Sequence, residues 1–241
     1  MGRQSFDNYS SLTKSDITFT EMSGRYLFQK DDEDHVVNDV LKKLELSSSD
    51  DLLEIGCGPG NLLGPLSEFV NSATGIDNAR VIDVLNNRYA DSQIKSYKGN
   101  FFDLSLSTKY EKILIYSVLH YLSDQDEVYR FIEKSLDLVK PGGKLLLGDL
   151  PNINAKERLV NTKFGKTFRD KWNKKLEKSG ATDFFSKLDP DDKLVVFTDE
   201  LIVNILSDFR KKGFLTFLYP QNSNLPFGLS REDILIEKVP E

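Results

Sequence analysis

Residues 51–60 read DLLEIGCGPG, and this stretch decides the fold of the chain. The apolar run Leu52–Ile55 leads directly into the glycine turn Gly56–Gly60, and an amphipathic stretch follows over Asn61–Phe69. Strand, glycine turn and helix in this order are typical of a βαβ unit that binds a nucleotide-like ligand. Glycines suit such a turn because a Cβ would keep ligand atoms away from the main chain and would oppose positive φ. We expect the helix to begin near Gly60 and to offer free N–H groups to the ligand.

A carboxylate follows the next predicted strand. Residues 73–77 read ATGID and place Asp77 21 positions after Gly56, close to the roughly 20 expected of an acid that accepts hydrogen bonds from ribose hydroxyls. Asp77 also suits the cap of a helix that we expect from Ala79, and both roles are compatible. The glycine spacing itself is G-x-G-x-G, and Asn61 stands where the dinucleotide fingerprint G-x-G-x-x-G has its third glycine. This departure argues against NAD as the ligand.

Four segments in order resemble the class I S-adenosylmethionine (SAM) dependent methyltransferases. They are Glu54 with the glycine turn, the GNFFD segment at Gly99–Asp103, KILIYSVLHYL at Lys112–Leu122, and LVKPGGKLLL at Leu138–Leu147. Together they lie within residues 52–147. The resemblance implies an α/β fold with a doubly wound, seven-stranded, mostly parallel sheet and an antiparallel C-terminal strand. It also implies SAM as the cofactor.

The resemblance further implies which residues contact the cofactor. Asp103 stands where the family has an Asp that meets the adenine amino group, and Phe102 would lie beside the base. Asp77 would bind the ribose. The full set of expected cofactor residues is Glu54, Gly56, Cys57, Gly58, Gly60, Asp77, Asn78, Asn100, Phe102, Asp103 and Ser117.

Methyl transfer from a sulfonium needs no protein nucleophile, but an acceptor hydroxyl or ammonium must lose a proton. His120 is the leading candidate for the base, because it follows the fourth strand and its ordinary pKa lies near neutrality. The alternative for His120 is a residue that only shapes the pocket. Asp149, at the end of the fifth strand, and Tyr121 are the second choices. No metal is expected, because Tyr116 and Ser117 stand where metal-assisted relatives have acidic ligands.

Two absences narrow the acceptor. Amino-methylating DNA enzymes carry a (Asp/Asn)-Pro-Pro-(Tyr/Phe) motif after the fourth strand, where this chain has Tyr116–Leu119. Methylation at C5 of a pyrimidine needs a nucleophilic cysteine at that strand, and the one cysteine, Cys57, lies in the glycine turn. Both patterns argue against methylation of a nucleobase.

Composition favours an ordinary globular protein of 241 residues with a net charge of −6. An acidic balance disfavours general nucleic-acid binding. One cysteine cannot form an internal disulfide, and no apolar run reaches the roughly 18 residues of a membrane span. We therefore expect a cytoplasmic protein without a membrane partner. The sequence indicates no oligomeric state.

The order of the predicted elements favours one methyltransferase domain over residues 1–241. Residues 1–46 form an N-terminal arm with scattered aromatics and then a helix over 31–46. Strands and helices alternate from residue 52 to 149, which predicts a parallel sheet. The ligand then belongs at the carboxyl ends of the strands. The chain closes with a helix and two strands. The expected strands are 52–55, 73–77, 94–97, 112–117, 144–149, 214–219 and 233–239, and the expected helices are 61–69, 79–89, 124–139 and 199–212.

An insertion after the fifth strand, residues 152–195, breaks this pattern. Residues 152–180 hold nine Lys or Arg and three Asp or Glu, so this segment carries +6 and the remaining chain −12. Phe164, Phe168, Trp172 and Leu176 recur every four positions, which predicts a helix with an apolar stripe, with a possible break at Gly165. The insertion is either a helical lid that attracts an anionic acceptor or a structural element that packs on the sheet's helices.

These patterns predict a SAM-dependent methyltransferase that acts on O or N of a small metabolite. We expect the acceptor to be anionic or sugar-linked, as in surface-glycan or natural-product biosynthesis. Two alternatives stay open. One is an RNA methyltransferase whose basic insertion grips phosphates, and the other is a non-catalytic SAM-binding subunit of a partner enzyme.

Overall fold

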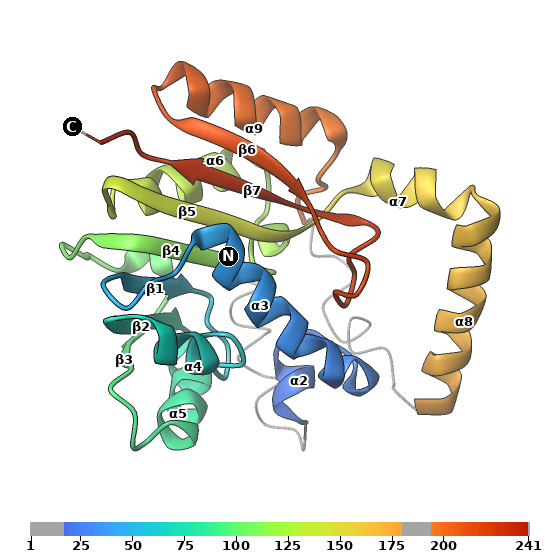
Figure 1. Ribbon diagram of the computed structural model, residues 1–241, viewed down its shortest axis with the longest axis horizontal. Helices are drawn as coiled ribbons and strands as arrows, with labels where there is room; N and C mark the ends of the chain where they lie inside the picture. Colours follow the sequence, from blue (N-terminus) through green and yellow to red (C-terminus); the bar gives the residue numbers. More distant parts are fainter. Residues whose placement is uncertain (1–16, 180–193, 241) are drawn as a thin grey trace.

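The computed structural model describes residues 17–179 and 194–240, which build a central sheet with helices on both faces (Figure 1). The sheet has seven strands in the order β3-β2-β1-β4-β5-β7-β6. Strands β1 to β5 pair in parallel, whereas β7 runs antiparallel to both β5 and β6. This confirms the predicted sheet. The strands are β1 (Asp51–Ile55), β2 (Ser72–Asp77), β3 (Lys95–Lys98), β4 (Tyr110–Tyr116), β5 (Val139–Pro151), β6 (Leu215–Pro220) and β7 (Arg231–Glu237).

Helices cover the sheet in two layers. One layer holds α3, α4 and α5, and the other holds α6 and α9. The α-helices are α2 (Phe19–Met22), α3 (Glu33–Leu44), α4 (Leu63–Leu66), α5 (Ala79–Arg88), α6 (Gln125–Leu136), α7 (Ile153–Val160), α8 (Lys163–Ser179) and α9 (Asp199–Lys211). Short 3₁₀ helices are η1 (Leu27–Asp32), η2 (Ser67–Phe69), η3 (Phe101–Asp103) and η4 (Leu119–Tyr121).

Alternating residues of each central strand belong to two separate hydrophobic cores, because successive side chains of a strand point to opposite faces. Leu53 of β1 and Ile113 of β4 belong to the core with Phe131 of α6. Their neighbours Leu52 and Leu114 belong to the core with α3, α4 and α5. Buried on both faces, the central strands read as the near-continuous apolar runs that a covered parallel sheet requires.

The helix expected over Asn61–Phe69 is much shorter in the structure. A turn follows Gly60, α4 has only four residues, and η2 completes the segment. Gly64 and Pro65 are poor helix formers, and Gly64 lies directly against the Tyr89 ring, where a Cβ would overlap it. The helix therefore begins at Leu63, three residues later than expected, and that its N–H groups face the ligand stays a prediction.

Several other boundaries moved by a few residues. The helix expected over 31–46 is α3, and the preceding turn is the 3₁₀ helix η1. The helix expected over 124–139 ends at Leu136, and Val139 already pairs with Tyr110. The reversal at Pro141–Gly143 lies inside β5, where Gly142 has φ +75 and its N–H donates to the Lys238 carbonyl at 2.8 Å.

The insertion after β5 forms two helices, α7 and α8, as Figure 1 shows at the right of the sheet. Its break lies at Asn161 and Thr162 and not at Gly165, which is inside α8. Gly165 faces the Leu159 carbonyl so closely that a Cβ would overlap it, so glycine is required for contact between the two helices. Residues 180–193 of the expected insertion lie outside the described residues.

Aromatic side chains connect α8 to the rest of the molecule. Trp172 packs edge-on against Phe28 of η1, with ring centroids 5.1 Å apart, and Phe227 of the β6–β7 loop lies 5.8 Å from it. The predicted stripe thus packs at Trp172, whereas Phe164 stays 61% exposed. The arm expected over residues 1–46 contributes α2 and η1 between these aromatic contacts and the glycine turn; residues 1–16 lie outside the described part.

Candidate functional site

A pocket opens at the carboxyl ends of β1 and β4, where the glycine turn leaves the sheet. Its walls come from the glycine turn, from the end of β4 and from the N-terminal arm. The lining residues are Ser23, Arg25, Glu54, Gly56, Cys57, Gly58, Asn61, Leu62, Asp77, Tyr116, Ser117, Val118 and Tyr121. Seven of the predicted site residues meet here: Glu54, Gly56, Cys57, Gly58, Asp77, Ser117 and Tyr121.

Glycine is required at the first position of the turn. Gly56 has φ +78, and a Cβ there would overlap the Val118 side chain. Gly60 has φ +84 and packs against Leu85 and Tyr89, so its role is contact between the turn and α5. Neither Gly60 nor Asn78 lines a described pocket.

Asp77 lines this pocket and also a second pocket beside it, and its carboxyl group has a shifted pKa. It is buried, and its oxygens accept hydrogen bonds from the N–H of Gly58 at 2.8 Å and of Asn78 at 2.7 Å. Burial nevertheless raises the pKa of Asp77 to about 6, against the effect of these two bonds. The helix cap expected of Asp77 is supplied instead by Asn78, whose side chain accepts from the Val81 N–H at 3.1 Å.

Glu54 and Arg25 bring opposite charges into the same pocket. Glu54 is 2% exposed, and its Oε2 has no hydrogen-bond partner among the described residues. Burial raises the pKa of Glu54 well above its usual value, and the Arg25 guanidinium acts in the opposite direction. A buried polar atom without a partner is rare in native proteins. This carboxylate and guanidinium fit a ligand that is zwitterionic, as the methionine part of SAM is.

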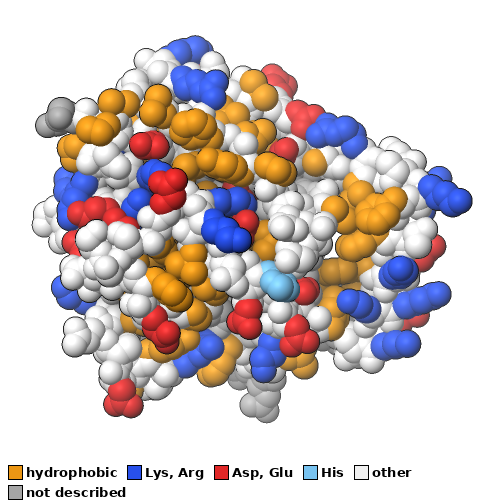
Figure 2. Space-filling view, in the orientation of Figure 1, with side chains coloured by type: hydrophobic (Ala, Val, Ile, Leu, Met, Phe, Trp, Pro, Cys, Tyr) orange, Lys and Arg blue, Asp and Glu red, His pale blue; other side chains and the backbone are white. Residues whose placement is uncertain are grey.

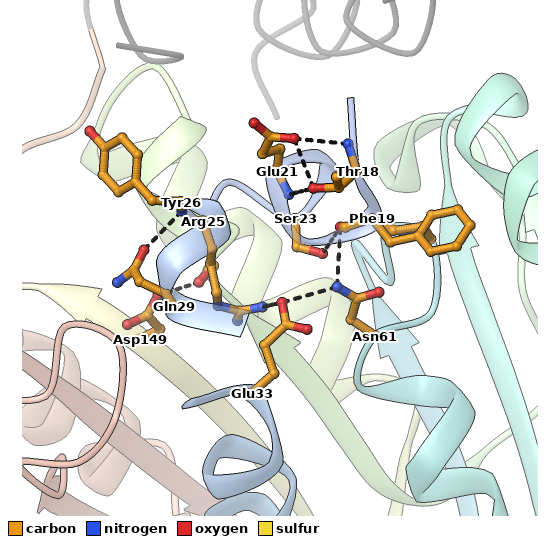
Figure 3. Close-up of polar contacts among 12 residues, drawn as sticks. Thr18, Phe19, Glu21, Ser23, Arg25, Tyr26, Gln29, Glu33, Asn61 and Asp149 are labelled. Atoms are coloured by element: carbon orange, nitrogen blue, oxygen red, sulfur yellow. Dashed lines mark hydrogen bonds and ion pairs between the residues drawn. The ribbon is translucent and has the colours of Figure 1, made fainter. Parts of the chain in front are cut away.

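The N-terminal arm closes one side of the pocket, as Figure 3 shows. Asn61 donates through Nδ2 to the Phe19 carbonyl and to Glu33 Oε1, both at 3.1 Å. Arg25 extends from the arm toward the same Glu33, with Nη1 3.6 Å from Oε1. The position of Asn61, where a dinucleotide fingerprint has glycine, therefore anchors the arm to the glycine turn.

A second pocket continues on the other side of Gly56, above β1 and β2. It is lined by Ile55, Gly56, Ile76, Asp77, Gly99, Asn100, Phe101, Val118 and Phe131. Phe101 takes the place expected of Phe102, which packs on Phe131 with ring centroids 5.3 Å apart. Asp103 is exposed and does not line this pocket. Asn100 caps η3 by accepting from the Phe102 N–H at 3.0 Å.

Two non-glycine residues adopt left-handed backbone where β4 and β5 end. Ser117 has φ +58 and Asp149 has φ +62, a conformation that costs free energy in non-glycine residues and gathers at functional sites. The Ser117 hydroxyl donates to Asp149 Oδ2. Arg231 of β7 donates through Nη1 to the same carboxylate oxygen at 2.9 Å and to the Asp149 carbonyl at 3.0 Å.

His120 and Tyr121 lie beside this cluster, with their rings 4.2 Å apart. Nδ1 of His120 is buried and has no hydrogen-bond partner among the described residues. Burial lowers the pKa of His120 well below its usual value, and the nearby Arg231 adds to this effect. Burial raises the pKa of Tyr121 to about 12. His120 is therefore neutral at physiological pH, and burial makes its protonation harder than that of a free imidazole, whereas Tyr121 is protonated.

Other features add little chemistry to the site. Burial raises the pKa of the Cys57 thiol well above its usual value, so this cysteine is a poor nucleophile. Within residues 17–179 and 194–240, no group of three or more His, Cys, Asp or Glu side chains is placed to hold a metal ion. No helix in the same ranges is long and apolar enough to cross a membrane.

The geometry is that of a Rossmann-like protein with a pocket at the glycine turn, where β1 and β4 end. Residues 53–147, from β1 into β5, match the methyltransferase domain family. The matched residues are therefore a methyltransferase domain, and the sheet has the strand order of the class I SAM-dependent methyltransferase fold.

Comparison with known proteins supports this family. A sterol 4-C-methyltransferase of Caenorhabditis elegans is 31% identical over 125 residues, which are 48% of this chain and 35% of that protein. The structure of the N-methyltransferase NodS from Bradyrhizobium japonicum with S-adenosylhomocysteine (SAH) aligns over 99% of this chain and 100% of its own, with a TM-score of 0.61 and 16% identity. Phosphoethanolamine N-methyltransferase 1 of Haemonchus contortus with phosphoethanolamine and SAH aligns over 98% of this chain and 49% of its own, with a TM-score of 0.67 and 14% identity.

These likenesses have different weight. At 16% and 14% identity the solved structures show a common fold only. The aligned region spans about a third of the nematode sterol enzyme. None of them determines the acceptor of this protein.

Sequence patterns missed the residues that come from distant parts of the chain. Ser23 and Arg25 line the pocket from the arm, and Arg231 reaches Asp149 from β7. No motif surrounds Arg25; the only signal was an arginine between aromatic residues in a polar arm.

Proposed function

We propose that this protein transfers the methyl group of SAM to O or N of a small metabolite that is anionic or sugar-linked. The observation that carries the proposal is that Glu54 and Arg25 line one pocket at the glycine turn, beside the bonded pair Ser117 and Asp149. The first pair suits the zwitterionic end of the cofactor. The cluster lies at the ends of β4 and β5, where an acceptor would approach.

When bound, SAM supplies the methyl electrophile, and the chain supplies position and a proton acceptor. Arg25 would hold the cofactor carboxylate, and Glu54 would face its ammonium. Asp77 would accept from the ribose hydroxyls, and Phe101 with Phe131 would border the adenine. Orienting the two reactants accounts for ~7–11 kcal/mol in well-ordered cases.

His120 is the proposed base, since burial keeps its imidazole neutral and its Nδ1 lacks a hydrogen-bond partner in the described structure. Asp149 is engaged by Ser117 and Arg231 and Tyr121 is protonated, so both are weaker candidates for this step. We propose that these two residues shape the part of the site where the acceptor binds.

The charge of α7 and α8 supports an anionic acceptor. The seven Lys and Arg of α8 are exposed, and α8 contacts the arm that lines the pocket. Lys175 Nζ lies 5.7 Å from the Phe28 ring centre. The insertion is thus a candidate lid that reaches the site through the arm. Phosphoethanolamine, named with a structurally similar enzyme, is an acceptor of the expected chemical class.

The test is a screen of fractionated metabolite extract with SAM that carries a labelled methyl group. We expect label in a small anionic or sugar-containing fraction, and less label at limiting SAM with the Asp77→Ala variant as the matched control. Label in an RNA fraction would favour the RNA methyltransferase. SAH binding without turnover on any fraction, together with a stoichiometric co-purifying partner, would favour the non-catalytic subunit.

A further inference from the structure

A buried ion pair connects α3 to β7 below the pocket. Lys43 Nζ lies 2.6 Å from Asp233 Oδ2 and 2.5 Å from Asp39 Oδ2. Asp233 is fully buried, and the Lys43 side chain is 10% exposed. Burying two opposite charges costs desolvation energy, and an apolar pair of similar volume is often as stable. Global stability alone is therefore a weak reason for charges at these positions.

The second oxygen of Asp233 accepts two hydrogen bonds. One comes from the backbone N–H of Asp149 at 2.7 Å, and the other from Nε2 of Gln221 at 2.9 Å. Lys43 thus orients the carboxylate through Oδ2, and Oδ1 is directed at the end of β5. The bond to the amide restrains Asp149 in its left-handed conformation, which an Asp side chain disfavours without support.

Two branches lead from Asp233 to the wall of the pocket. In the first, the restrained Asp149 carboxylate accepts from the hydroxyl of Ser117, and the Ser117 N–H donates to the Gly148 carbonyl at 3.1 Å. In the second, Gln221 Nε2 lies 3.2 Å from the hydroxyl of Tyr116. Tyr116 and Ser117 are consecutive, and both line the pocket at the glycine turn.

We propose that Lys43 and Asp233 are positioning residues for cofactor binding: they fix the end of β4, so that Tyr116 and Ser117 hold their places in the pocket wall. Neither residue lines the pocket. The inference rests on the proposed cofactor site and not on the proposed acceptor. Its test therefore measures cofactor binding, and the result does not depend on the substrate class.

The test measures SAH affinity by calorimetry and melting temperature on the full chain. In the double variant Lys43→Met with Asp233→Leu both charges of the Lys43–Asp233 pair are removed, and the one carboxylate that loses its partner is Asp39, whose side chain is 19% exposed. The Asp149 amide nevertheless loses its acceptor. We expect SAH affinity to fall about tenfold, as for one lost hydrogen bond in a buried site, while the protein still melts cooperatively. Asp233→Asn retains an acceptor oxygen for the amide and should bind SAH within about twofold of the parent.

Lys144→Met is the matched control. Lys144 also joins β5 to the α3 region, through Glu45 at 2.5 Å, but at the opposite end of the strand. It should leave SAH affinity unchanged. Gln221→Met removes the bond from Gln221 to the Tyr116 hydroxyl and leaves the Lys43–Asp233 ion pair intact. It should weaken SAH binding by about threefold or more. This variant tests the inference even if the double variant does not fold. The proposal is overturned if the double variant binds SAH as tightly as the parent. If the double variant does not fold, parent-like SAH affinity in Gln221→Met overturns it. An equal loss in Lys144→Met overturns it as well.

Discussion

At the scale of single residues, the pocket combines groups whose burial has changed their acid–base behaviour. Asp77 and His120 show the two directions. Burial makes ionisation of Asp77 harder and protonation of His120 harder, so both neutral forms are favoured relative to the free side chains. As the pH falls, neutral Asp77 should weaken ligand binding, whereas neutral His120 keeps the proposed base unprotonated.

Asp77 should make SAH binding sensitive to pH. Ribose hydroxyls donate to the ionised carboxylate, which becomes protonated as the pH falls through about 6. We expect SAH affinity to be full above this pH and to weaken below it. In Asp77→Ala the affinity should fall by ~1–3 kcal/mol at neutral pH, the usual cost of losing hydrogen bonds to a polar partner, and the pH dependence near 6 should vanish. Calorimetry at several pH values checks both; an unaltered SAH affinity in the variant would remove Asp77 from the site.

His120 should affect turnover and not cofactor affinity. If its imidazole takes the acceptor proton, His120→Ala lowers kcat by about 10²-fold or more, the typical contribution of a general base. Because burial lowers the pKa of His120, the base stays neutral into mildly acidic solution, and the acid limb of the parent pH–rate profile should lie below the ordinary histidine range. His120→Gln controls for volume. Near-parental kcat in either variant would leave His120 with a pocket-shaping role only.

At the scale of elements, α8 is the unusual feature. Over Lys163–Ser179 its one buried residue is Gly165. Trp172 nevertheless packs α8 against the arm that lines the pocket. A helix that contacts the body through Trp172, which packs on Phe28 and Phe227, and whose cationic side chains are exposed (Figure 2), is well placed to attract anions by long-range electrostatics. This arrangement gives the lid hypothesis a measurable consequence.

Replacing Lys171, Lys174 and Lys175 by Gln should raise the apparent KM of an anionic acceptor and reduce its dependence on salt, with SAH affinity unchanged. Replacing the exposed Lys42, Lys95 and Lys109, which lie outside the insertion, should change neither quantity by a comparable amount. Initial rates over a series of ionic strengths measure both. Equal KM and equal salt slope in the α8 variant and the parent would leave α8 as a structural element that packs on the arm.

At the scale of the whole molecule, the arm, the glycine turn and the end of β4 meet around one pocket, and a cofactor bound there would connect all three. SAH at 100 times its Kd should therefore stabilise the fold by ~2.7 kcal/mol. For a chain of this size that corresponds to a rise in Tm of roughly 5–10 °C. Thermal unfolding with and without SAH measures it, and NAD should give no rise. Arg25→Met should reduce the SAH effect at equal ligand concentration; a full effect would mean that Arg25 does not contact the cofactor.

The sequence by itself determined the features that depend on local pattern. A strand, a glycine turn and an acid 21 residues later are short-range signals, and their side chains meet because parallel strands end at one edge of the sheet. Glu54, Gly56, Asp77 and Ser117, which the sequence predicts for the cofactor site, accordingly line one pocket. The seven-stranded, mostly parallel sheet and its antiparallel C-terminal strand followed from the family resemblance and are confirmed.

Only the tertiary structure decided which distant segments complete the site. Arg25 and Ser23 come from an arm without periodicity, and Asp233 is 190 residues from its partner Lys43. Contacts over such separations leave no spacing rule in one sequence, because they depend on how whole elements pack. The same reason explains why Phe101, and not Phe102, lines the second pocket: both rings fit the motif and both pack against Phe131, so only the fold around them determines which ring borders the pocket.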